Sequence, residues 1–408
     1  IDRLRTTASE RRCTHFASKI RHTVNTDSHP EFWIDVGGTF TDCIARFPDG
    51  TVLRHKTLSS GRIQGMVGAG SDSIRLLDSN LPGSVPSVWR GYQLHLIDNG
   101  GCEIASATVA DFDPAKRALL LSEPLSVAPQ LGQRYMLSTG EHAPLVAIRF
   151  LLGLSADDDI GVVSVKLGTT RGTNTLLTRT GARVGLLTTR GLADGLEIGY
   201  QNRPFLFELN IRKPERLYTR VCELDERLAA DGSVLIPLDE DSARDKLLDM
   251  QRSGIESLAV CLLHSYVNPV HELRIRDLAR QIGFHHVSVS HQIAQTLGWI
   301  ARSDTTVVDA YLSPILTNYI DEIRRGLGPN SRLQLLTSAG DLVGAARFRG
   351  KDSVLSGPAG GVVGFSSAAQ LAGFSRAIGF DMGGTSTDVS RFDHGFERQF
   401  ETEKAGVR

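Results

Sequence analysis

Cysteine is scarce in this chain, and the few cysteines are widely scattered. Cys13, Cys43, Cys102, Cys222 and Cys261 are odd in number, and none forms a CxxC pair. This spacing argues against a disulfide framework and against a cysteine-rich zinc site, and it favours reduced thiols in a cytoplasmic protein. Cys43 and Cys261 lie in apolar, strand-like runs, where a small buried side chain is a more common role than a nucleophile.

Long apolar runs and an excess of charge of one sign are also absent. No run approaches the roughly 20 apolar residues that span a bilayer, and the formal net charge is only −1. This balance gives no electrostatic reason to expect nucleic acid or a membrane as a partner. Residues 1–31 are basic but lack the apolar centre of a secretory signal, so we expect a disordered extension there.

The most informative feature that is present is a motif that occurs twice. Asp35–Asp42 reads DVGGTFTD and Asp381–Asp388 reads DMGGTSTD, so six of the eight positions are identical. Each copy predicts a strand, a tight Gly-Gly turn and a second strand. Paired glycines let backbone N–H groups approach a polyphosphate, and an aspartate at a strand end can hold a divalent cation or orient a nucleophile. We call these two segments the phosphate turns.

Two phosphate turns in similar contexts predict two related lobes that face one nucleotide. This is the duplicated arrangement of the actin, sugar kinase and Hsp70 ATPase superfamily. Two ordinary glycine hairpins are the alternative, because short motifs also occur by chance. The expected fold class is therefore α/β, with actin-like duplicated lobes.

The rest of the chain predicts an α/β organisation with at least one mostly parallel sheet. Its 408 residues, 41% of them hydrophobic, are enough for two or more packed domains. Short alternating runs over 89–140 predict a small β-rich insertion, and strands and helices alternate from there on. Strands are expected at 161–167, 184–188, 257–263 and 286–289, and helices at 143–154, 242–251 and 271–282. The expected segments are 1–31, 32–88, 89–140, 141–300 and 301–408.

Further motifs follow one another in a definite order. They are GTTRGTN at 168–174, GLEIG at 195–199 with QNRP at 201–204, LHSY at 263–266, TTVVDAYL at 305–312 and SGPAGG at 356–361. Together with the phosphate turns, they resemble the hydantoinase A and 5-oxoprolinase family of ATP-dependent lactam-opening enzymes. The resemblance covers essentially Phe32 to the last residue.

The resemblance implies that ATP, with Mg²⁺, activates a poorly electrophilic carbonyl by phosphorylating its oxygen. The family includes 5-oxoprolinases, N-methylhydantoinases and subunits of acetone and acetophenone carboxylases. The segment 89–137 is similar to that of long oxoprolinase-like bacterial forms, which favours hydrolysis of 5-oxo-L-proline to L-glutamate. The alternatives are an N-methylhydantoinase, a ketone carboxylase subunit, a sugar kinase of the same superfamily or an inactive fragment.

The two phosphate turns contain most of the residues that are expected to act in phosphoryl transfer. Asp35 and Asp381 are expected to form the catalytic acidic pair that organises Mg²⁺. Thr41 is expected either to contact the nucleotide or to brace its hairpin. Gly360 and Gly361 are expected either to present backbone amides to the nucleotide at a helix N-terminus or to allow close packing. The residues expected to cradle the phosphates are Gly37, Gly38, Thr39, Gly383, Gly384 and Thr385.

Candidate substrate contacts lie elsewhere. Thr169, Thr170 and Asn174 follow the carboxyl end of a predicted parallel strand, where open α/β sheets place ligands. Arg203, on a predicted loop, matches a substrate carboxylate, although a structural salt bridge is an equal alternative. His264 and His271 are either metal or acid–base groups or, with no third ligand nearby, structural residues.

Members of the family continue for hundreds of residues beyond the second phosphate turn, whereas this sequence stops soon after it. We therefore expect an N-terminal piece, C-terminally incomplete, with weak or no ATP turnover by itself. Full activity is expected to need the missing C-terminal region or a hydantoinase B-type subunit, in an oligomer that acts on a small lactam.

Overall fold

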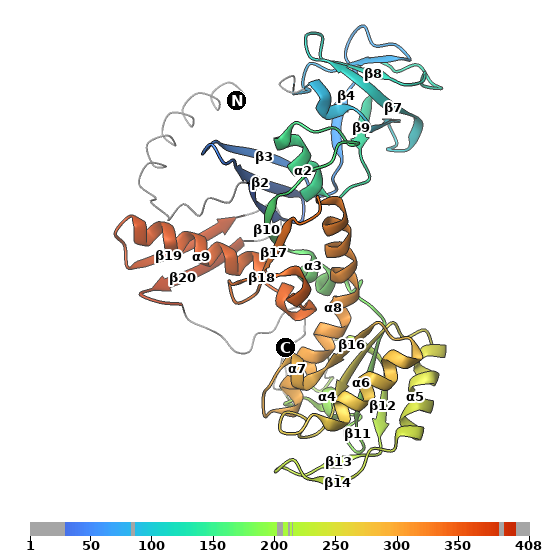
Figure 1. The fold of residues 1–408 in the computed structure, drawn as a ribbon, viewed down its shortest axis with the longest axis vertical. Helices are drawn as coiled ribbons and strands as arrows, with labels where there is room; N and C mark the ends of the chain where they lie inside the picture. The colour runs from blue at the N-terminus through green and yellow to red at the C-terminus, as the bar shows by residue number, and fades with distance from the viewer. Residues whose placement is uncertain are drawn as a thin grey trace.

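The computed structural model describes residues 29–82, 86–201, 207–210, 213, 215–382 and 387–396. The predicted basic extension therefore lies outside the described residues, except for its last three positions. The molecule is elongated, with a β-rich part at one end, a central sheet in the middle and a parallel sheet at the other end (Figure 1). None of the helices in these ranges is both long enough and apolar enough to cross a membrane.

The central sheet contains the first phosphate turn. Its six strands run in the order β18-β17-β10-β1-β2-β3, in which β1, β10 and β17 are mutually parallel and the others are antiparallel to their neighbours. Alternate side chains point inward, so Phe32 and Ile34 of β1 pack with Val165 and Leu167 of β10 in one core. The bounds are β1 Glu31–Val36, β2 Phe40–Arg46, β3 Val52–Leu58, β10 Ser164–Thr169, β17 Arg332–Leu336 and β18 Leu342–Gly344.

The β-rich part is an antiparallel sheet of six strands in the order β4-β9-β6-β7-β8-β5. Trp89, Tyr92 and Tyr135 are fully buried in its core. The β-rich part begins before the predicted boundary at residue 89, because the short strands β4 and β5 pair with β9 and β8. The bounds are β4 Ile63–Met66, β5 Arg75–Leu77, η2 Pro86–Trp89, β6 Gln93–Ile97, β7 Glu103–Asp113, β8 Ala118–Leu121 and β9 Arg134–Ser138.

The third part is a four-stranded parallel sheet in the order β12-β11-β15-β16. Every residue of β11 and β15 is buried, as expected for parallel strands that are covered on both faces. The strands β11, β15 and β16 and the helices α5 and α6 lie within two residues of the predicted elements, whereas β12 and α7 were not predicted. The bounds are β11 Val184–Thr189, β12 Tyr218–Leu224, α5 Glu240–Arg252, β15 Ser257–Cys261, α6 Val270–Ile282, β16 His286–Val289 and α7 Ser290–Ile293.

Shorter elements complete the described chain. A small hairpin, β13–β14, lies beyond the parallel sheet, and helix α2 covers the central sheet (Figure 1). The bounds are α2 Ala143–Leu152, α3 Arg171–Thr178, α4 Gly195–Ile198, β13 Arg227–Leu228, β14 Val234–Ile236, η3 Ala345–Arg347, η4 Gly350–Ser353, α9 Ser356–Leu371, β19 Arg376–Met382 and β20 Thr387–Asp393.

One long helix, α8 (Trp299–Gly326), connects the parallel sheet to the central sheet. At 28 residues it spans roughly 42 Å, given a rise of about 1.5 Å per residue. Its first half packs on β15 and β16, and Tyr319, Ile320 and Ile323 of its second half join the core of the central sheet. The buried carboxylate of Asp309, near its middle, accepts bonds from Ser288 Oγ at 2.7 Å and from the Lys351 N–H at 3.1 Å. The helix therefore fixes how the two sheets are placed.

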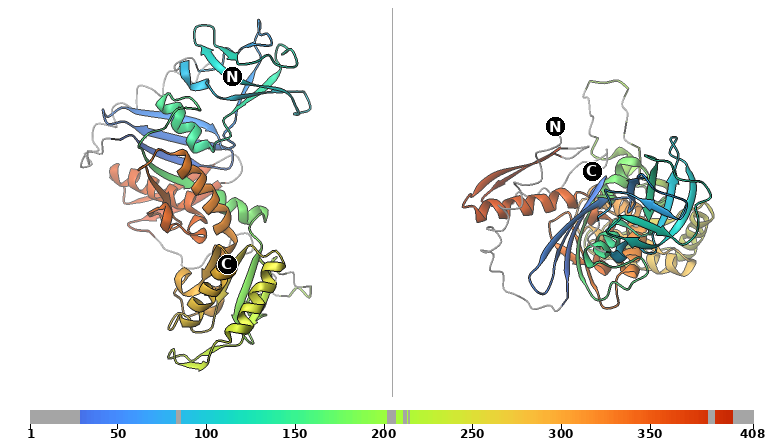
Figure 2. Two further views of the ribbon diagram at one scale, coloured as in Figure 1. Left: turned by 45° about the vertical axis from the view of Figure 1, so that its right-hand side comes forward. Right: turned by 90° about the horizontal axis from the view of Figure 1, so that it is seen from above.

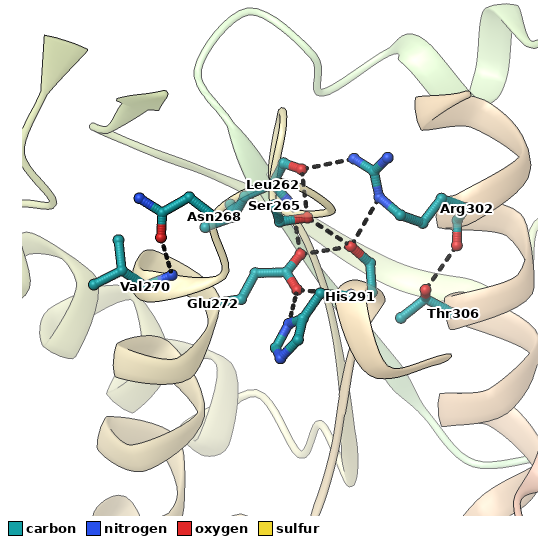
Figure 3. Close-up of polar contacts among 9 residues, drawn as sticks. Leu262, Ser265, Asn268, Val270, Glu272, His291, Arg302 and Thr306 are labelled. Carbon is teal, nitrogen blue, oxygen red and sulfur yellow. Dashed lines mark hydrogen bonds and ion pairs between the residues drawn. The ribbon is translucent and has the colours of Figure 1, made fainter. Parts of the chain in front are cut away.

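A buried polar network anchors the first half of α8 (Figure 3). Glu272 of α6 accepts hydrogen bonds from the Leu262 N–H at 3.0 Å, from Ser290 Oγ at 2.6 Å and from both the N–H and Nδ1 of His291. Arg302 of α8 donates to Ser290 Oγ at 3.0 Å and to the Leu262 carbonyl at 2.8 Å. Glu272 and Arg302 are fully buried, and their hydrogen bonds offset the cost of removing two charges from water.

We predict that Glu272→Ala destabilises the protein strongly, by about 3–5 kcal/mol, because it removes the acceptor of a buried network and leaves its donors unpaired. Glu240→Ala is a matched control, since Glu240 accepts from Arg274 in an exposed ion pair, and solvent screening should make its loss far less costly. Urea unfolding of both variants checks the difference. Similar losses in the two variants would contradict the assigned role of the buried network.

Candidate functional site

The two phosphate turns form hairpins with the same register. In the first, β1 and β2 pair Asp35 with Asp42 and Val36 with Thr41. In the second, β19 and β20 pair Asp381 with Asp388 and Met382 with Thr387. The strands on either side of the turn therefore pair in the same way in both copies of the motif. The predicted phosphate contacts Gly383, Gly384 and Thr385 lie outside the described residues.

The surroundings of the two hairpins differ. Ile34, just before Asp35, is 3% exposed within the six-stranded sheet, whereas Phe380, at the matching position before Asp381, is 68% exposed in a two-stranded sheet. Helix α9 packs on the second hairpin, and the pair projects to one side of the central sheet (Figure 2). The described residues thus cover only one face of the second hairpin.

The first phosphate turn is braced from within. The Gly37 N–H donates to the Phe40 carbonyl at 3.0 Å, and Ser59 Oγ donates to the Gly37 carbonyl at 2.8 Å. Thr41 is fully buried and shares a hydrogen bond of 3.0 Å with Ser59 Oγ. A Cβ at Gly37 would lie 3.0 Å from the Phe40 oxygen, so close backbone packing favours glycine there. Thr41 lies inside the hairpin, and Thr39 is exposed on the turn.

Asp35 lies at the end of β1 in an acidic setting. Its side chain reaches solvent, but neighbouring protein removes part of its hydration, and this is the largest cause of a raised pKa. The carboxylates of Asp42 and Asp381 raise the pKa of Asp35 further, while Lys56 opposes them. Asp381 thus lies near enough to Asp35 to repel it electrostatically. An acidic pair of this kind attracts a divalent cation.

A cavity of about 400 Å³ opens beside the first phosphate turn. Gly37 and Gly38 line one side, and Thr169, Thr170 and Asn174 line another. Two predicted phosphate contacts, Gly37 and Gly38, therefore share one cavity with three predicted substrate residues, whereas Asp35, Thr39 and Thr41 are not among the residues that line it. The other lining residues are Val36, Ser59, Ser60, His142, Ala143, Arg171, Thr175, Thr178, Thr180 and Tyr319.

Hydrogen bonds hold the two sides of the cavity together. Both the N–H and Oγ1 of Thr170 donate to the Val36 carbonyl, at 3.0 and 3.2 Å. Asn174 Nδ2 donates to Thr170 Oγ1 at 3.4 Å, and a Cβ on Gly38 would lie 3.9 Å from that same nitrogen. Thr170 and Asn174 therefore position the phosphate turn as well as lining the cavity.

Three cavity residues escaped the sequence analysis. Arg171 begins α3, and its guanidinium lies 4.6 Å from the ring centre of Tyr319 on α8. His142, at the start of α2, packs edge-on against the same ring and contacts Glu322 at 2.5 Å. Arg171 lies within the GTTRGTN motif and could have been singled out there. His142 and Tyr319 are far away in sequence, in segments without a motif.

The other candidates have different surroundings. Gly360 lies in the second turn of α9, where a Cβ would be 2.5 Å from Leu336, so it serves close packing. Its N–H, like that of Gly361, lies beyond the first turn of the helix, where amides bond within the helix. His271 is buried with its Nδ1 2.7 Å from Glu226. Arg203 lies outside the described residues.

The structure agrees with the reading of the cysteines. Burial raises the pKa of the Cys43 and Cys261 thiols to about 12, so both stay protonated near neutral pH. In the part of the chain that is described, no three His, Cys, Asp or Glu side chains gather into a metal cluster. Mg²⁺ needs no such cluster, since one or two carboxylates plus substrate phosphates commonly hold it, and Asp35 with Asp381 fits that pattern.

We predict that Asp35→Asn stabilises the fold in metal-free buffer at neutral pH. Because the pKa of Asp35 is raised in the folded state, its charged form costs stability above that pKa, and the cost vanishes below the unfolded pKa. The gain in melting temperature should therefore shrink as the pH falls towards about 4. Thermal unfolding between pH 4 and 8 measures it.

Asp72→Asn is the control for this experiment and should behave in the opposite way. The N–H groups of Ile74 and Arg75 lower the pKa of Asp72, so its loss should destabilise the protein at neutral pH and have no effect at low pH. An Asp35→Asn variant that follows the trend of Asp72→Asn would contradict the electrostatic reading of the acidic pair.

Comparison with known proteins places the chain in a family. Residues 127–283 match the model of the hydantoinase/oxoprolinase N-terminal region, and residues 302–408 match the hydantoinase/oxoprolinase model. The chain is 39% identical over 311 residues to the 5-oxoprolinase of Saccharomyces cerevisiae, an alignment that covers 69% of this chain and 24% of that protein. The chain thus spans about a quarter of that relative's length.

Two solved structures share the fold. A nucleotide-free acetone carboxylase matches 92% of this chain and 46% of its own, with a TM-score of 0.62 and 19% identity. An ATP-dependent caprolactamase from Pseudomonas jessenii matches 88% of this chain and 43% of its own, with a TM-score of 0.55 and 24% identity. The family models, the alignment and the shared α/β fold agree, and the chain belongs to the hydantoinase/oxoprolinase family.

Proposed function

We propose that this chain provides the phosphoryl-transfer site of an enzyme that uses ATP to open a five-membered lactam, with 5-oxo-L-proline as the substrate and L-glutamate, ADP and phosphate as the products. The observation that carries the proposal is the shared cavity. The first phosphate turn and the GTTRGTN segment line the same space, so a nucleotide and a small substrate can meet there. The relatedness to the yeast 5-oxoprolinase supports the choice of ring.

The order of strands in the central sheet supports an actin-like first lobe. An antiparallel run, β3-β2-β1, is extended by the parallel strands β10 and β17, with the phosphate turn between β1 and β2. We infer that the β19–β20 hairpin begins the second lobe, since it repeats the same motif and register. The charge of Asp381 raises the pKa of Asp35, and this proximity supports the proposal that the two turns face one nucleotide.

The proposed chemistry follows from amide resonance. A lactam carbonyl resists water. Transfer of the γ-phosphoryl group of ATP to the lactam oxygen would release ADP and the lactam N–H proton and leave a phosphate ester, and Mg²⁺ would supply charge neutralisation. Water would then add to the activated carbon, the C–N bond would break as the nitrogen takes up a proton, and a second water would hydrolyse the resulting acyl phosphate to a carboxylate and phosphate.

The residues of this chain would position and neutralise the reacting groups. Asp35 and Asp381 would hold the cation and orient the accepting oxygen. The backbone N–H groups of Gly38 and Thr39, and those of Gly383–Thr385, would donate to the phosphates, while the Gly37 N–H holds the turn by its bond to the Phe40 carbonyl. Thr169, Thr170 and Asn174 would face the substrate from the opposite side of the cavity.

The rest of the machinery is proposed to lie outside this sequence. Because the chain spans only about a quarter of the yeast relative, we propose that full turnover needs further chain or a hydantoinase B-type subunit. The tests below therefore use the intact natural protein that carries residues 1–408, with its partner subunit where one exists.

We predict that 5-oxo-L-proline stimulates phosphate release from ATP and Mg²⁺ by the intact protein, with one glutamate formed per phosphate. Coupled phosphate and amino-acid assays measure both products. A stable phosphorylated substrate without ring opening would indicate a kinase instead. Phosphate release that no lactam stimulates would overturn the proposal.

We predict that Asp35→Asn and Asp381→Asn each lower lactam-dependent phosphate release by about 100-fold or more, because each removes a charge that organises the reacting oxygens. Asp277→Asn is the control, since Asp277 is an exposed carboxylate that pairs with the partly buried Arg276 in α6, far from the phosphate turns in sequence, and its loss should leave the rate unchanged. Initial rates at saturating ATP measure the effect. Full activity in either Asp35 or Asp381 variant would exclude that residue from the acidic pair.

A further inference from the structure

Arg171 is the cation of the cavity that has no anionic partner. It lies at the first position of α3 and is exposed to the cavity that Gly37, Gly38 and Thr170 also line. Its guanidinium stacks over Tyr319, 4.6 Å from the ring centre. Within the described residues, no carboxylate pairs with it.

The position of Arg171 is electrostatically unfavourable without an anion. The N-terminus of a helix carries partial positive charge, so a cation in the first turn costs stability. No acidic residue occupies the first turn of α3 to offset it. An anionic group in the cavity would be attracted both by the guanidinium and by the helix end.

The surroundings of Arg171 favour a planar oxyanion. The Tyr319 ring holds the guanidinium beside the cavity, and a guanidinium offers a fork of N–H donors that matches a carboxylate bidentately. Tyr319 is only 3% exposed. Its hydroxyl lies near Thr169, yet it makes no hydrogen bond of ordinary geometry within the described chain.

We propose that Arg171, held in place by Tyr319, binds the carboxylate of the lactam substrate and selects acidic lactams over neutral ones. The inference rests on the proposed function, because it assigns the substrate end of that same cavity. In 5-oxo-L-proline the carboxylate and the lactam carbonyl are attached to the two carbons that flank the ring nitrogen. A carboxylate on Arg171 therefore leaves the carbonyl to face the other side of the cavity, where Gly37 and Gly38 lie.

This assignment replaces Arg203 with Arg171 as the carboxylate-binding residue. Arg203 lies on a predicted loop outside the described residues, whereas Arg171 lines a cavity with the phosphate turn. A nucleotide phosphate is the other oxyanion that a guanidinium in this cavity could bind. The experiment must therefore separate binding of the lactam carboxylate from binding of ATP.

The test compares two ligands that differ only in charge, 5-oxo-L-proline and its neutral amide, on the intact protein. Calorimetry measures their binding, and phosphate release measures KM and kcat with each. Arg171→Gln should weaken binding of the acid about 10- to 100-fold, the usual effect of losing a charged hydrogen-bonded pair, and leave the amide unchanged. Arg171→Lys keeps the positive charge but loses the forked pair of N–H donors, so its affinity for the acid should lie between those of the wild type and Arg171→Gln. The KM for ATP should not move in either variant.

Arg324→Gln is the matched control. Arg324 lies one turn beyond Tyr319 on α8, in an exposed ion pair with Asp321, and its loss should change none of these values. Tyr319→Leu should reproduce part of the defect by freeing the guanidinium, whereas Tyr319→Phe keeps the stacking surface and should bind the acid more nearly as the wild type does. Equal melting temperatures for the Arg171 variants and the wild type establish that the fold is intact.

The outcomes separate this inference from the proposed function. If the wild type binds the acid more tightly than the amide and Arg171→Gln keeps the same preference, the carboxylate binds elsewhere. That result would overturn the inference and leave the proposed lactam opening intact. If Arg171→Gln instead raises the KM for ATP, the guanidinium serves the nucleotide and the inference is overturned. If the acid binds through Arg171 without stimulating phosphate release, the carboxylate site stands and the proposed reaction falls. If wild type binds neither ligand, both are wrong.

Discussion

The parallel pairing of β1 with β10 is the interaction on which the site depends. It sets Asp35 opposite Gly168 and Val36 opposite Thr169, so the phosphate turn after β1 and the GTTRGTN segment after β10 leave the sheet at the same edge. Parallel strands bring the ends of distant segments together in this way, and open α/β sheets place ligands at that edge. The Thr170 bonds to the Val36 carbonyl then lock the two segments side by side.

Glycine at position 168 belongs to the same arrangement. A Cβ there would lie 3.3 Å from Asp35 Oδ1, so any side chain would crowd the carboxylate that the phosphate turn presents. Gly172, four residues on, is packed against Ser353, where a Cβ would be 1.9 Å from Oγ. The glycines of the GTTRGTN motif therefore serve close packing, one beside the acidic pair and one where α3 meets η4. Its hydroxyl and amide side chains are left to line the cavity.

Helix α8 gives the site its third wall. The buried network of Glu272 and Arg302 fixes its beginning against the parallel sheet, and the bonds of Asp309 fix its middle. Tyr319, near its end, then reaches the cavity beneath Arg171. A single helix thus links the parallel sheet, none of whose described strands lines the cavity, to the tyrosine that contacts Arg171 inside it. The hydrogen bonds of Glu272, Arg302 and Asp309 specify one position for the helix.

Much of the fold could be read from local patterns. The strands at Val184–Thr189, Ser257–Cys261 and His286–Val289 and the helices α5 and α6 lie close to where periodicity predicted them, because runs of buried aliphatic residues and amphipathic helices are local signals. The short strands β4 and β5 were missed, because three or four residues carry too little periodicity and acquire their structure from pairing with β9 and β8.

By itself, the sequence determined the two phosphate turns, the GTTRGTN segment and their resemblance to one family, because each is a contiguous motif whose residue types follow from the local backbone that it needs. Only the tertiary structure decided that the first turn and the GTTRGTN segment share a cavity, that Thr41 is buried and that Gly360 serves packing. It alone brought Tyr319 and His142 to Arg171, since the contacts between them depend on how β10, α2 and α8 pack around the central sheet, and no local pattern records such contacts.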